Sequence, residues 1–343
     1  MEKPKVYFYK DTSNLKAGIN KFFQMITEEE KYDPDEQIGI KIHFGEREND
    51  THVDPELLKG LPKIFQKPIF VECNVLYRGN RTNKSDHLQQ AAEHGFDFIE
   101  IEILDGEIGG DFMEIEIDTK NTKLAKLGKE LRKFHQLISI AHFKGHIATG
   151  FGGAFKNIGM GLGSRGGKLD MHAGISPKIQ EEKCIACGAC AEQCPGDAIT
   201  VENVAEIDQS LCIGCAQCIA ICPEGAVGIP WGSHSNEVLM EKIAEYTLAA
   251  LKNRNWWYIN FLTDITLKCD CVGTKQEPIM EDIGILFSKD PVAIDQASLD
   301  LVIEYNAGID PFKKANNVNS EHLLEYAEKI DMGSREYELE RIE

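Results

Sequence analysis

The sequence predicts an α/β fold, in which a layered domain with a mixed sheet is interrupted by a small, cysteine-rich α+β domain. Segments with strand and helix patterns alternate along most of the 343 residues, which is typical of layered α/β domains. Eight of the 11 cysteines lie between Cys184 and Cys222. Hydrophobic residues make up 42% of the chain and charged residues 27%, a balance typical of globular proteins with a buried core.

Strands are expected where short apolar or alternating runs lie between turn residues, and helices where apolar residues recur every three or four positions. The expected strands cover residues 6–9, 38–44, 69–73, 98–104, 112–117, 137–142, 257–262 and 283–287. The expected helices cover residues 14–29, 54–65, 85–94, 124–134, 237–251 and 290–305. Asp54-Pro55 and Asp290-Pro291 each give a helix a capping residue and a proline in its first turn.

The alternation of strands and helices stops near residue 176 and resumes near residue 231. We therefore expect a discontinuous α/β domain formed by residues 1–176 plus 231–343, with a cysteine-rich domain of residues 177–230 inserted into it. A length of 343 residues fits roughly two domains.

The charge and hydropathy of the chain exclude several partners. Lys and Arg number 37 while Asp and Glu number 56, so the formal net charge is −19. This balance argues against nucleic-acid binding, which needs clustered cations. No apolar run approaches the roughly 18 residues of a membrane helix, and the N-terminus lacks the apolar stretch of a secretory signal. We expect a cytoplasmic protein with no nucleic-acid and no membrane partner.

The eight clustered cysteines form two copies of one motif, C-x2-C-x2-C-x3-C-P, offset by 28 residues. The first copy consists of Cys184, Cys187, Cys190 and Cys194, followed by Pro195. The second copy consists of Cys212, Cys215, Cys218 and Cys222, followed by Pro223. The flanking residues repeat as well, so the segment is an internal duplication of one supersecondary unit.

This spacing suits a cuboidal iron–sulfur cluster. Three thiolates two residues apart can surround one face of the cluster, and small residues such as Ala186 and Gly214 let backbone N–H groups approach the sulfides. The fourth cysteine of this bacterial-type motif ligates the other cluster. We therefore predict two 4Fe-4S clusters. The first is held by Cys184, Cys187, Cys190 and Cys222, and the second by Cys212, Cys215, Cys218 and Cys194.

Residues 177–230 resemble two-cluster bacterial ferredoxins. The alternatives are zinc, although zinc ribbons usually show two separated C-x2-C pairs, and an empty, degenerate copy. A unit this short cannot bury enough apolar surface to fold alone, so the clusters would also form its core. Two clusters with exchanged ligands lie close together and would conduct electrons. Acidic residues outnumber basic ones here, which could steer a basic redox partner protein, although a solvated acidic face is the simpler explanation.

Polar residues follow three expected strands of the α/β domain, at the ends where open α/β sheets bind ligands. These residues are Lys41, His43, Asn74, His142 and Lys144. If the strands are parallel neighbours, the side chains converge on one crevice. The alternative for each one alone is a solvated lysine or a hydrogen-bonded core residue.

A glycine-rich stretch, residues 150–168, contains Gly152, Gly153, Lys156 and Asn157. Glycines let backbone N–H groups approach an anion, and Lys156 could supply a positive charge. The alternative is a flexible joint that leads into the cysteine-rich domain. A G-x-G-x-x-G match within the stretch follows no expected strand and is discounted.

We take Lys156, Lys144 and His43 as candidate catalytic residues. The candidate binding residues are Lys41, Asn74, His142, Asn157, Gly152 and Gly153.

Cys269-Asp270-Cys271 places two thiols and a carboxylate within three residues. These residues could bind a third metal, form a redox pair or lie in an inert turn. A C-x-C spacing alone does not decide between the three possibilities.

Three stretches of the chain, residues 72–83, 142–157 and 269–295, resemble the domain of unknown function 362 family in its version with a ferredoxin insert. The resemblance extends over nearly the whole chain. It implies an iron–sulfur protein with the domain layout given above and without an established reaction, so it leaves the substrate open.

These predictions favour a redox protein in which two 4Fe-4S clusters exchange electrons with a small-molecule ligand or metal site in the α/β domain, which would make it an iron–sulfur oxidoreductase. The alternative is a non-enzymatic electron-transfer or cluster-carrier module that docks a protein partner. A third hypothesis is a metal-dependent enzyme that uses Cys269, Asp270 and Cys271, with largely structural clusters. No nicotinamide or flavin site is indicated.

Overall fold

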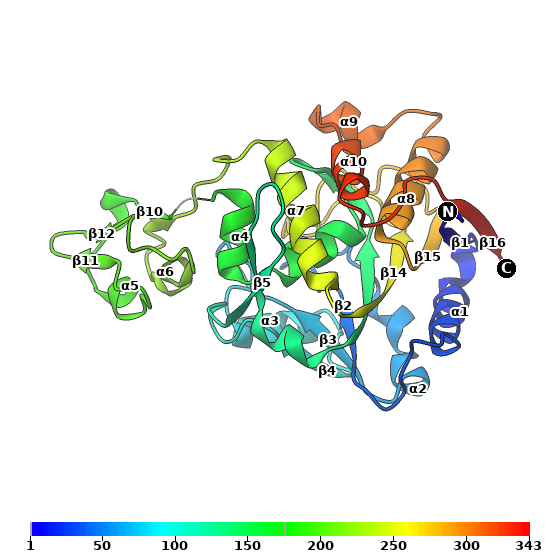
Figure 1. Ribbon diagram of the computed structural model, residues 1–343, viewed down its shortest axis with the longest axis horizontal. Helices are drawn as coiled ribbons and strands as arrows, with labels where there is room; N and C mark the ends of the chain where they lie inside the picture. Colours follow the sequence, from blue (N-terminus) through cyan, green and yellow to red (C-terminus); the bar gives the residue numbers. More distant parts are fainter. Residues whose placement is uncertain (1, 175) are drawn as a thin grey trace.

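The computed structural model describes residues 2–174 and 176–343. A large α/β body lies at one end of the molecule and a small cysteine-rich unit at the other (Figure 1). The two chain ends lie close together in the α/β body, where strand β1 (Lys5–Tyr9) pairs with strand β16 (Glu338–Ile342), far from the cysteine-rich unit. No helix in the described residues is long and apolar enough to cross a membrane.

The α/β body is built on one eight-stranded sheet with the order β16-β1-β15-β14-β7-β2-β3-β4. Every neighbouring pair is parallel except the two pairs that β15 makes, so the sheet is mixed, as the sequence predicts. The remaining strands of this sheet are β15 (Gly284–Ser288), β14 (Asn255–Leu262), β7 (Gln136–His142), β2 (Ile38–Lys41), β3 (Pro68–Glu72) and β4 (Glu100–Ile103).

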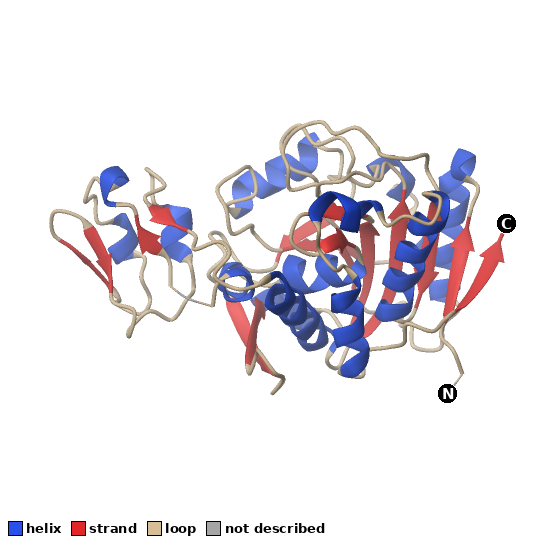
Figure 2. Ribbon diagram, turned by 90° about the horizontal axis from the view of Figure 1, so that it is seen from above, coloured by secondary structure: helices blue, strands red, loops and turns tan. Residues whose placement is uncertain are grey.

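Helices cover both faces of this sheet, which gives three layers (Figure 2). One face is covered by α1 (Leu15–Thr27), η2 (Pro55–Leu58), α2 (Leu61–Ile64) and α3 (Lys84–Glu93). The other face is covered by η4 (Lys156–Met160), α4 (Arg165–His172), α7 (Asn236–Leu251), α8 (Pro291–Tyr305) and α10 (Glu321–Lys329). Shorter helices are η1 (Thr12–Asn14), η3 (Lys129–Lys133) and α9 (Pro311–Asn316).

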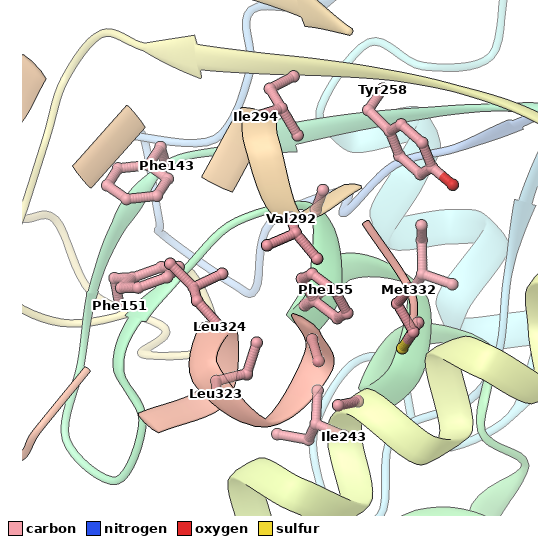
Figure 3. Packing of buried hydrophobic residues seen from close by; sticks show 14 of the residues in the cluster. Phe143, Phe151, Phe155, Ile243, Tyr258, Val292, Ile294, Leu323, Leu324 and Met332 are labelled. Atoms are coloured by element: carbon pink, nitrogen blue, oxygen red, sulfur yellow. The ribbon is translucent and has the colours of Figure 1, made fainter. Parts of the chain in front are cut away.

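The strands send alternate side chains into two separate hydrophobic clusters, one on each face of the sheet. In β14, Trp256 and Tyr258 pack in the cluster beneath α7 and α8, whereas Trp257 packs in the cluster beneath α1. Figure 3 shows part of the first cluster, in which Phe143 stacks on Phe151 with ring centroids 4.9 Å apart. Neither cluster contains a residue of the cysteine-rich unit, so the α/β body has a core of its own.

Two of the expected helices are wrong. Residues 124–134 form a strand, β6 (Leu124–Gly128), and the short helix η3, because Ala125 and Leu127 pack inward from a hairpin with β5 (Phe112–Glu116). Residues 54–65 form η2 and the single-turn α2. Lys59 and Gly60 separate these two pieces, and Pro62 in the first turn of α2 cannot donate the hydrogen bond that a continuous helix requires.

The cysteine-rich unit consists of two small antiparallel ladders and two short helices. β10 (Lys178–Ile179) pairs with β13 (Val227–Gly228), and β11 (Ile199–Val201) pairs with β12 (Ala205–Ile207). η5 (Glu181–Lys183) comes just before the first cysteine motif. α5 (Ala189–Glu192) lies within the first motif and α6 (Gln217–Ile221) within the second.

Candidate functional site

A cavity of about 410 Å³ lies at the carboxyl ends of β2, β3 and β7. These three strands are parallel neighbours, so residues far apart in the sequence meet there. Seven of the nine candidate residues from the α/β domain line the cavity, namely Lys41, His43, His142, Lys144, Gly153, Lys156 and Asn157. Asn74 and Gly152 do not line it.

Lys41 connects the strands to η4. Its Nζ donates hydrogen bonds to Glu72 Oε2 at 3.0 Å and to Asn157 Oδ1 at 2.9 Å. Asn157 Nδ2 in turn donates to the carbonyl oxygen of Lys41 and to Ser139 Oγ. Burial lowers the pKa of Lys41, while the carboxylate of Glu72 raises it. The buried lysine is therefore held in place by a paired carboxylate and by the amide of Asn157.

Asp270 holds two cavity residues in place. His142 Nδ1 lies 2.9 Å from Asp270 Oδ1, and Lys144 Nζ lies 3.0 Å from Asp270 Oδ2. Burial alone would raise the pKa of Asp270, yet His142 and Lys144 hold it well below its usual range. His142 Nε2 lies 3.0 Å from the carbonyl oxygen of Thr263, so acceptor oxygens lie beside both ring nitrogens.

The thiols on either side of Asp270 are joined to each other. Cys269 and Cys271 form a disulfide, and Cys271 lines the cavity. Neither sulfur is a free thiolate in this form, and Asp270 is taken up by His142 and Lys144. The turn is nevertheless not inert, because its carboxylate positions two side chains of the cavity.

His43 lines the cavity and has a defined tautomer. Its Nδ1 accepts a hydrogen bond from the backbone N–H of Gly45 at 3.0 Å, so a neutral ring carries its proton on Nε2. Burial and the nearby charge of Arg81 lower the pKa of His43 well below its usual value. The ring is therefore neutral near pH 7 and can donate a hydrogen bond from Nε2.

Lys156, the first residue of η4, differs from the other lysines of the cavity. Among the described residues, its Nζ makes no hydrogen bond and no ion pair within 4 Å, whereas Lys41 and Lys144 each contact a carboxylate. Burial and the nearby charge of Lys144 lower the pKa of Lys156 to about 7. Gly152 leaves room for this side chain, since a Cβ there would lie 3.2 Å from Lys156 Cδ.

The glycine-rich stretch is no flexible joint, because it forms β9 (Gly150–Gly152), η4 and α4. β9 pairs with β8 (Lys144–His146). The expected anion cradle already holds a carboxylate of the protein. Asp295 of α8 accepts hydrogen bonds from the N–H groups of Ala154 at 2.7 Å and Phe155 at 3.0 Å. These two N–H groups are thus not free for a ligand.

Asn74 supports the loop after β3 and does not line the cavity. Its Nδ2 donates to Asp105 Oδ1 at 3.0 Å and to the carbonyl oxygen of Gly106 at 2.8 Å. Its backbone N–H also donates to Asp105. The structure therefore gives Asn74 a hydrogen-bonding role within the fold.

The sequence interpretation missed several residues that line the cavity. They include Glu72, Arg81, Lys168, His172 and Trp231. A buried lysine needs a partner, so the carboxylate that ends the strand beside Lys41 could have identified Glu72. Arg81 is paired with buried Glu46 at 3.0 Å, and no local pattern indicates that contact. Trp231 follows the cysteine-rich unit and packs on His172, with ring centroids 4.7 Å apart.

The motif cysteines fall into two groups in space. Cys184, Cys187, Cys190 and Cys222 line one cavity, which we call the outer site. The other four, Cys212, Cys215, Cys218 and Cys194, we call the inner site. Burial raises the pKa of Cys215, and the nearby thiols of Cys194 and Cys212 raise it further. Each group takes three cysteines from one motif and one from the other.

In the described residues, no three or more His, Cys, Asp or Glu side chains are placed to bind a single metal ion. A 4Fe-4S cluster makes a different demand on its ligands, because each thiolate binds a different iron. Its cysteines therefore surround the cluster and do not converge on one point. A cavity lined by four cysteines, such as the outer site, fits this demand.

The backbone geometry of the two motifs repeats with the same offset of 28 residues. Three pairs of equivalent residues have positive φ angles, namely Ala186 and Gly214, Gly188 and Ala216, and Asp197 and Gly225. Ala198 N–H donates to Cys194 Sγ at 3.3 Å, and the equivalent Ala226 N–H donates to Cys222 Sγ at 3.2 Å. The structure thus repeats the turns and the N–H donors that thiolate ligands of a cluster require.

The inner site faces the α/β body through α4. A Cβ at Gly166 would lie 2.8 Å from the carbonyl oxygen of Gly214 and 3.2 Å from Cys215 Cα. Lys126 of β6 donates to the carbonyl oxygen of Ile213 at 2.6 Å. Cys215 is accordingly buried, whereas its equivalent in the first motif, Cys187, is exposed.

Comparison with known proteins gave three kinds of match. The family model of the domain of unknown function DUF362 matches residues 38–300. A ferredoxin from Butyribacterium methylotrophicum is 54% identical over 33 residues, which are 10% of this chain and 58% of that ferredoxin. This match supports iron–sulfur binding in a short stretch of the chain and does not extend to the number or type of clusters.

Two solved structures are similar in part. The lactate racemase apoprotein from Thermoanaerobacterium thermosaccharolyticum is 12% identical with a TM-score of 0.41, over 76% of this chain and 51% of that chain. A protein from Thermotoga maritima is 10% identical with a TM-score of 0.41, over 89% of this chain and 58% of that chain. The chain thus spans only about half the length of these structures. The family match, by contrast, covers most of the sequence, and the chain therefore belongs to the DUF362 family.

Proposed function

We propose that the protein is an iron–sulfur redox protein that exchanges electrons with a small molecule bound in the cavity of the α/β body. In this proposal residues 177–230 form an inserted ferredoxin-type domain with two 4Fe-4S clusters, and residues 1–176 plus 231–343 form the ligand-binding domain. When bound, such clusters accept and release single electrons. The outer site would hold one cluster and the inner site the other.

The observation that carries the proposal is the position of α4 between the inner site and the cavity. Gly166 and Leu169 of α4 contact the cysteine-rich unit. Lys168 and His172 of the same helix line the cavity. Leu76 also joins the two, since it packs in the hydrophobic cluster of the cysteine-rich unit and lines the cavity. A ligand in the cavity would thus lie on one side of α4, with the inner site on the other.

The side chains of the cavity can bind a ligand and supply protons to it. Reduction of an organic molecule generally adds protons as well as electrons. Lys156, whose pKa is lowered to about 7 by burial and by Lys144, can hold or release a proton at neutral pH. His43 can donate a hydrogen bond from Nε2. Lys144, fixed by Asp270, adds a positive charge beside them.

The cysteine-rich unit offers a surface for a redox partner on its outer side. Cys187 is exposed there, and the neighbouring Ile185 is 62% exposed. Residues 177–230 contain eight acidic and two basic side chains. We expect an electron-transfer partner with a basic surface, because charge of the opposite sign accelerates docking.

Native mass spectrometry of protein purified without oxygen tests the proposal. We expect a mass increase that corresponds to two 4Fe-4S clusters, together with a small molecule that is retained by the wild type and lost in Lys156→Met. The exposed Lys63→Met is the matched control and should retain the molecule. Two clusters without any retained or added small molecule would instead support an electron-transfer module that docks a protein partner.

A further inference from the structure

We infer that the cavity of the α/β body binds an organic anion, with its carboxylate or phosphate at Lys156 and its apolar part against the apolar residues that line the cavity. The inference rests on the proposed function only in placing the ligand in this cavity. It adds the chemical class of that ligand.

The first argument is the balance of charge around the cavity. In the part of the chain that the structure describes, five cationic side chains line it, namely Lys41, Arg81, Lys144, Lys156 and Lys168, whereas Glu72 is the one carboxylate among its lining residues. Glu46 and Asp270 lie behind the wall and pair with Arg81 and Lys144. Five cations against these three carboxylates leave an excess of two positive charges.

The excess lies on two lysines. In the described part of the chain, no carboxylate lies within 4 Å of Lys156 Nζ or Lys168 Nζ. Lys168 Nζ donates to the carbonyl oxygens of Gly161 and Gly163, so its donors are partly satisfied. Lys156 has no such partner and lies among the positive charges of Lys144, Arg81 and Lys41. Lys156 is half-buried, and a charge that is largely removed from solvent is ordinarily paired, so an anionic ligand would complete this site.

The second argument is the composition of the remaining wall. Val75, Leu76, Ile147, Met160, Leu239 and Ile243 line the cavity. A volume of about 410 Å³ lies within the range of small-molecule sites, which are mostly apolar with a few placed polar groups. An inorganic anion alone would leave this apolar surface uncovered. An anion with an apolar body would contact both the positively charged and the apolar lining residues.

Fluorescence titration with 8-anilinonaphthalene-1-sulfonate tests this inference, because this probe joins a negative charge to an apolar body. N-phenyl-1-naphthylamine, which lacks the sulfonate, is the matched neutral probe. We expect one strong site for the sulfonate in the oxygen-free protein. Lys156→Met should weaken sulfonate binding by about tenfold or more and leave the neutral probe unaffected. Lys156→Arg and the surface control Lys63→Met should retain sulfonate binding.

Displacement of the sulfonate by phenyl phosphate or by phenylacetate then distinguishes a phosphate from a carboxylate ligand. Equal binding of the two fluorescent probes, or unchanged sulfonate binding in Lys156→Met, would overturn the inference. Iron and sulfide are measured on the same samples. Clusters without an anion site contradict only this inference, and an anion site in protein that lacks iron contradicts only the proposed function.

Discussion

The cysteine-rich unit and the cavity of the α/β body are held together in different ways. The cysteine-rich unit has a small hydrophobic cluster, which includes three of its own cysteines, Cys190, Cys218 and Cys222. The cavity stands on a sheet with a separate hydrophobic cluster on each face, and its charged groups are fixed by contacts such as Lys41 to Glu72. In our proposal the unit depends on bound clusters for its structure, whereas the charged groups of the cavity are held by contacts within the fold.

Removal of iron should have the largest effect, because it should unfold the cysteine-rich unit and leave the α/β body folded. Without clusters the thiols lose their shared ligand, so residues 177–230 should unfold while the sheet of the α/β body persists. Hydrogen–deuterium exchange measured by mass spectrometry should show protection in the unit falling by orders of magnitude, with β7 and β14 unchanged. Retained protection of β11 and β12 in the iron-free protein would show that the unit folds by itself.

Paired cysteine substitutions should separate the outer site from the inner site. Cys184→Ser with Cys222→Ser removes two ligands of one site and should leave about half of the iron, as expected for one of two 4Fe-4S clusters. Cys184→Ser with Cys194→Ser takes both cysteines from the first motif and should disturb both sites. Iron analysis should find clearly less iron in the second variant. Equal iron in the two variants would contradict the exchange of ligands between motifs.

Two lysines of the cavity should differ in their effect on stability. Lys41→Met leaves Glu72 buried without its partner and should lower the free energy of unfolding of the α/β body by about 3–5 kcal/mol. Lys156→Met removes no hydrogen bond or ion pair that the structure describes and should change that free energy by about 1 kcal/mol or less. Denaturant unfolding, followed by the fluorescence of Trp256 and Trp257 in the core, measures both. A comparable loss in both variants would show that Lys156 has a partner within the fold.

The pH dependence of anion binding is expected to be a smaller effect, and it tests the role of Lys156 specifically. Burial and Lys144 lower the pKa of Lys156 to about 7, and a bound anion favours its charged form. The anion therefore binds best below pH 7, and its affinity should fall by about tenfold per pH unit above that value, as one lost proton requires. The other groups around Lys156 are Lys41, Arg81, Lys144, His146, His172 and Asp270.

The two histidines of this set do not produce the same pH dependence. Burial and nearby Lys156 lower the pKa of His146 well below its usual value and that of His172 to about 4, so both are neutral across the measured range. Lys156→Arg, which keeps its charge, should give a flat profile between pH 6 and pH 9 in the sulfonate titration. A falling profile in that variant would assign the dependence to another group.

The sequence predicts features that depend on neighbouring residues better than features that depend on contacts between distant segments. The first three cysteines of each motif could be grouped from their spacing of two residues, and the place of the fourth cysteine followed from the bacterial-type motif. The layered α/β sheet was also predictable, since strand and helix patterns alternate along most of the chain. The hairpin that contains β6 was not predictable. Residues Leu124 to Gly128 suit either a helix or a strand, and it is their pairing with β5 that makes them a strand.

The residues of the cavity were likewise predictable only where a local pattern marked them. The polar ends of β2 and β7 marked Lys41 and His142 as candidates, and the parallel order of the strands brings them together. The anchoring role of Asp270 depends on a contact across 128 positions of the chain, which no local pattern reveals. For Gly153, the sequence pointed to a ligand, whereas the neighbouring N–H groups bind Asp295 of the protein itself.

Iron and acid-labile sulfide analysis of protein purified without oxygen tests the central claim most directly. The account predicts a brown protein with about eight iron and eight sulfide ions per chain, the content of two 4Fe-4S clusters. A colourless protein that remains free of sulfide after reconstitution with iron and sulfide would contradict it.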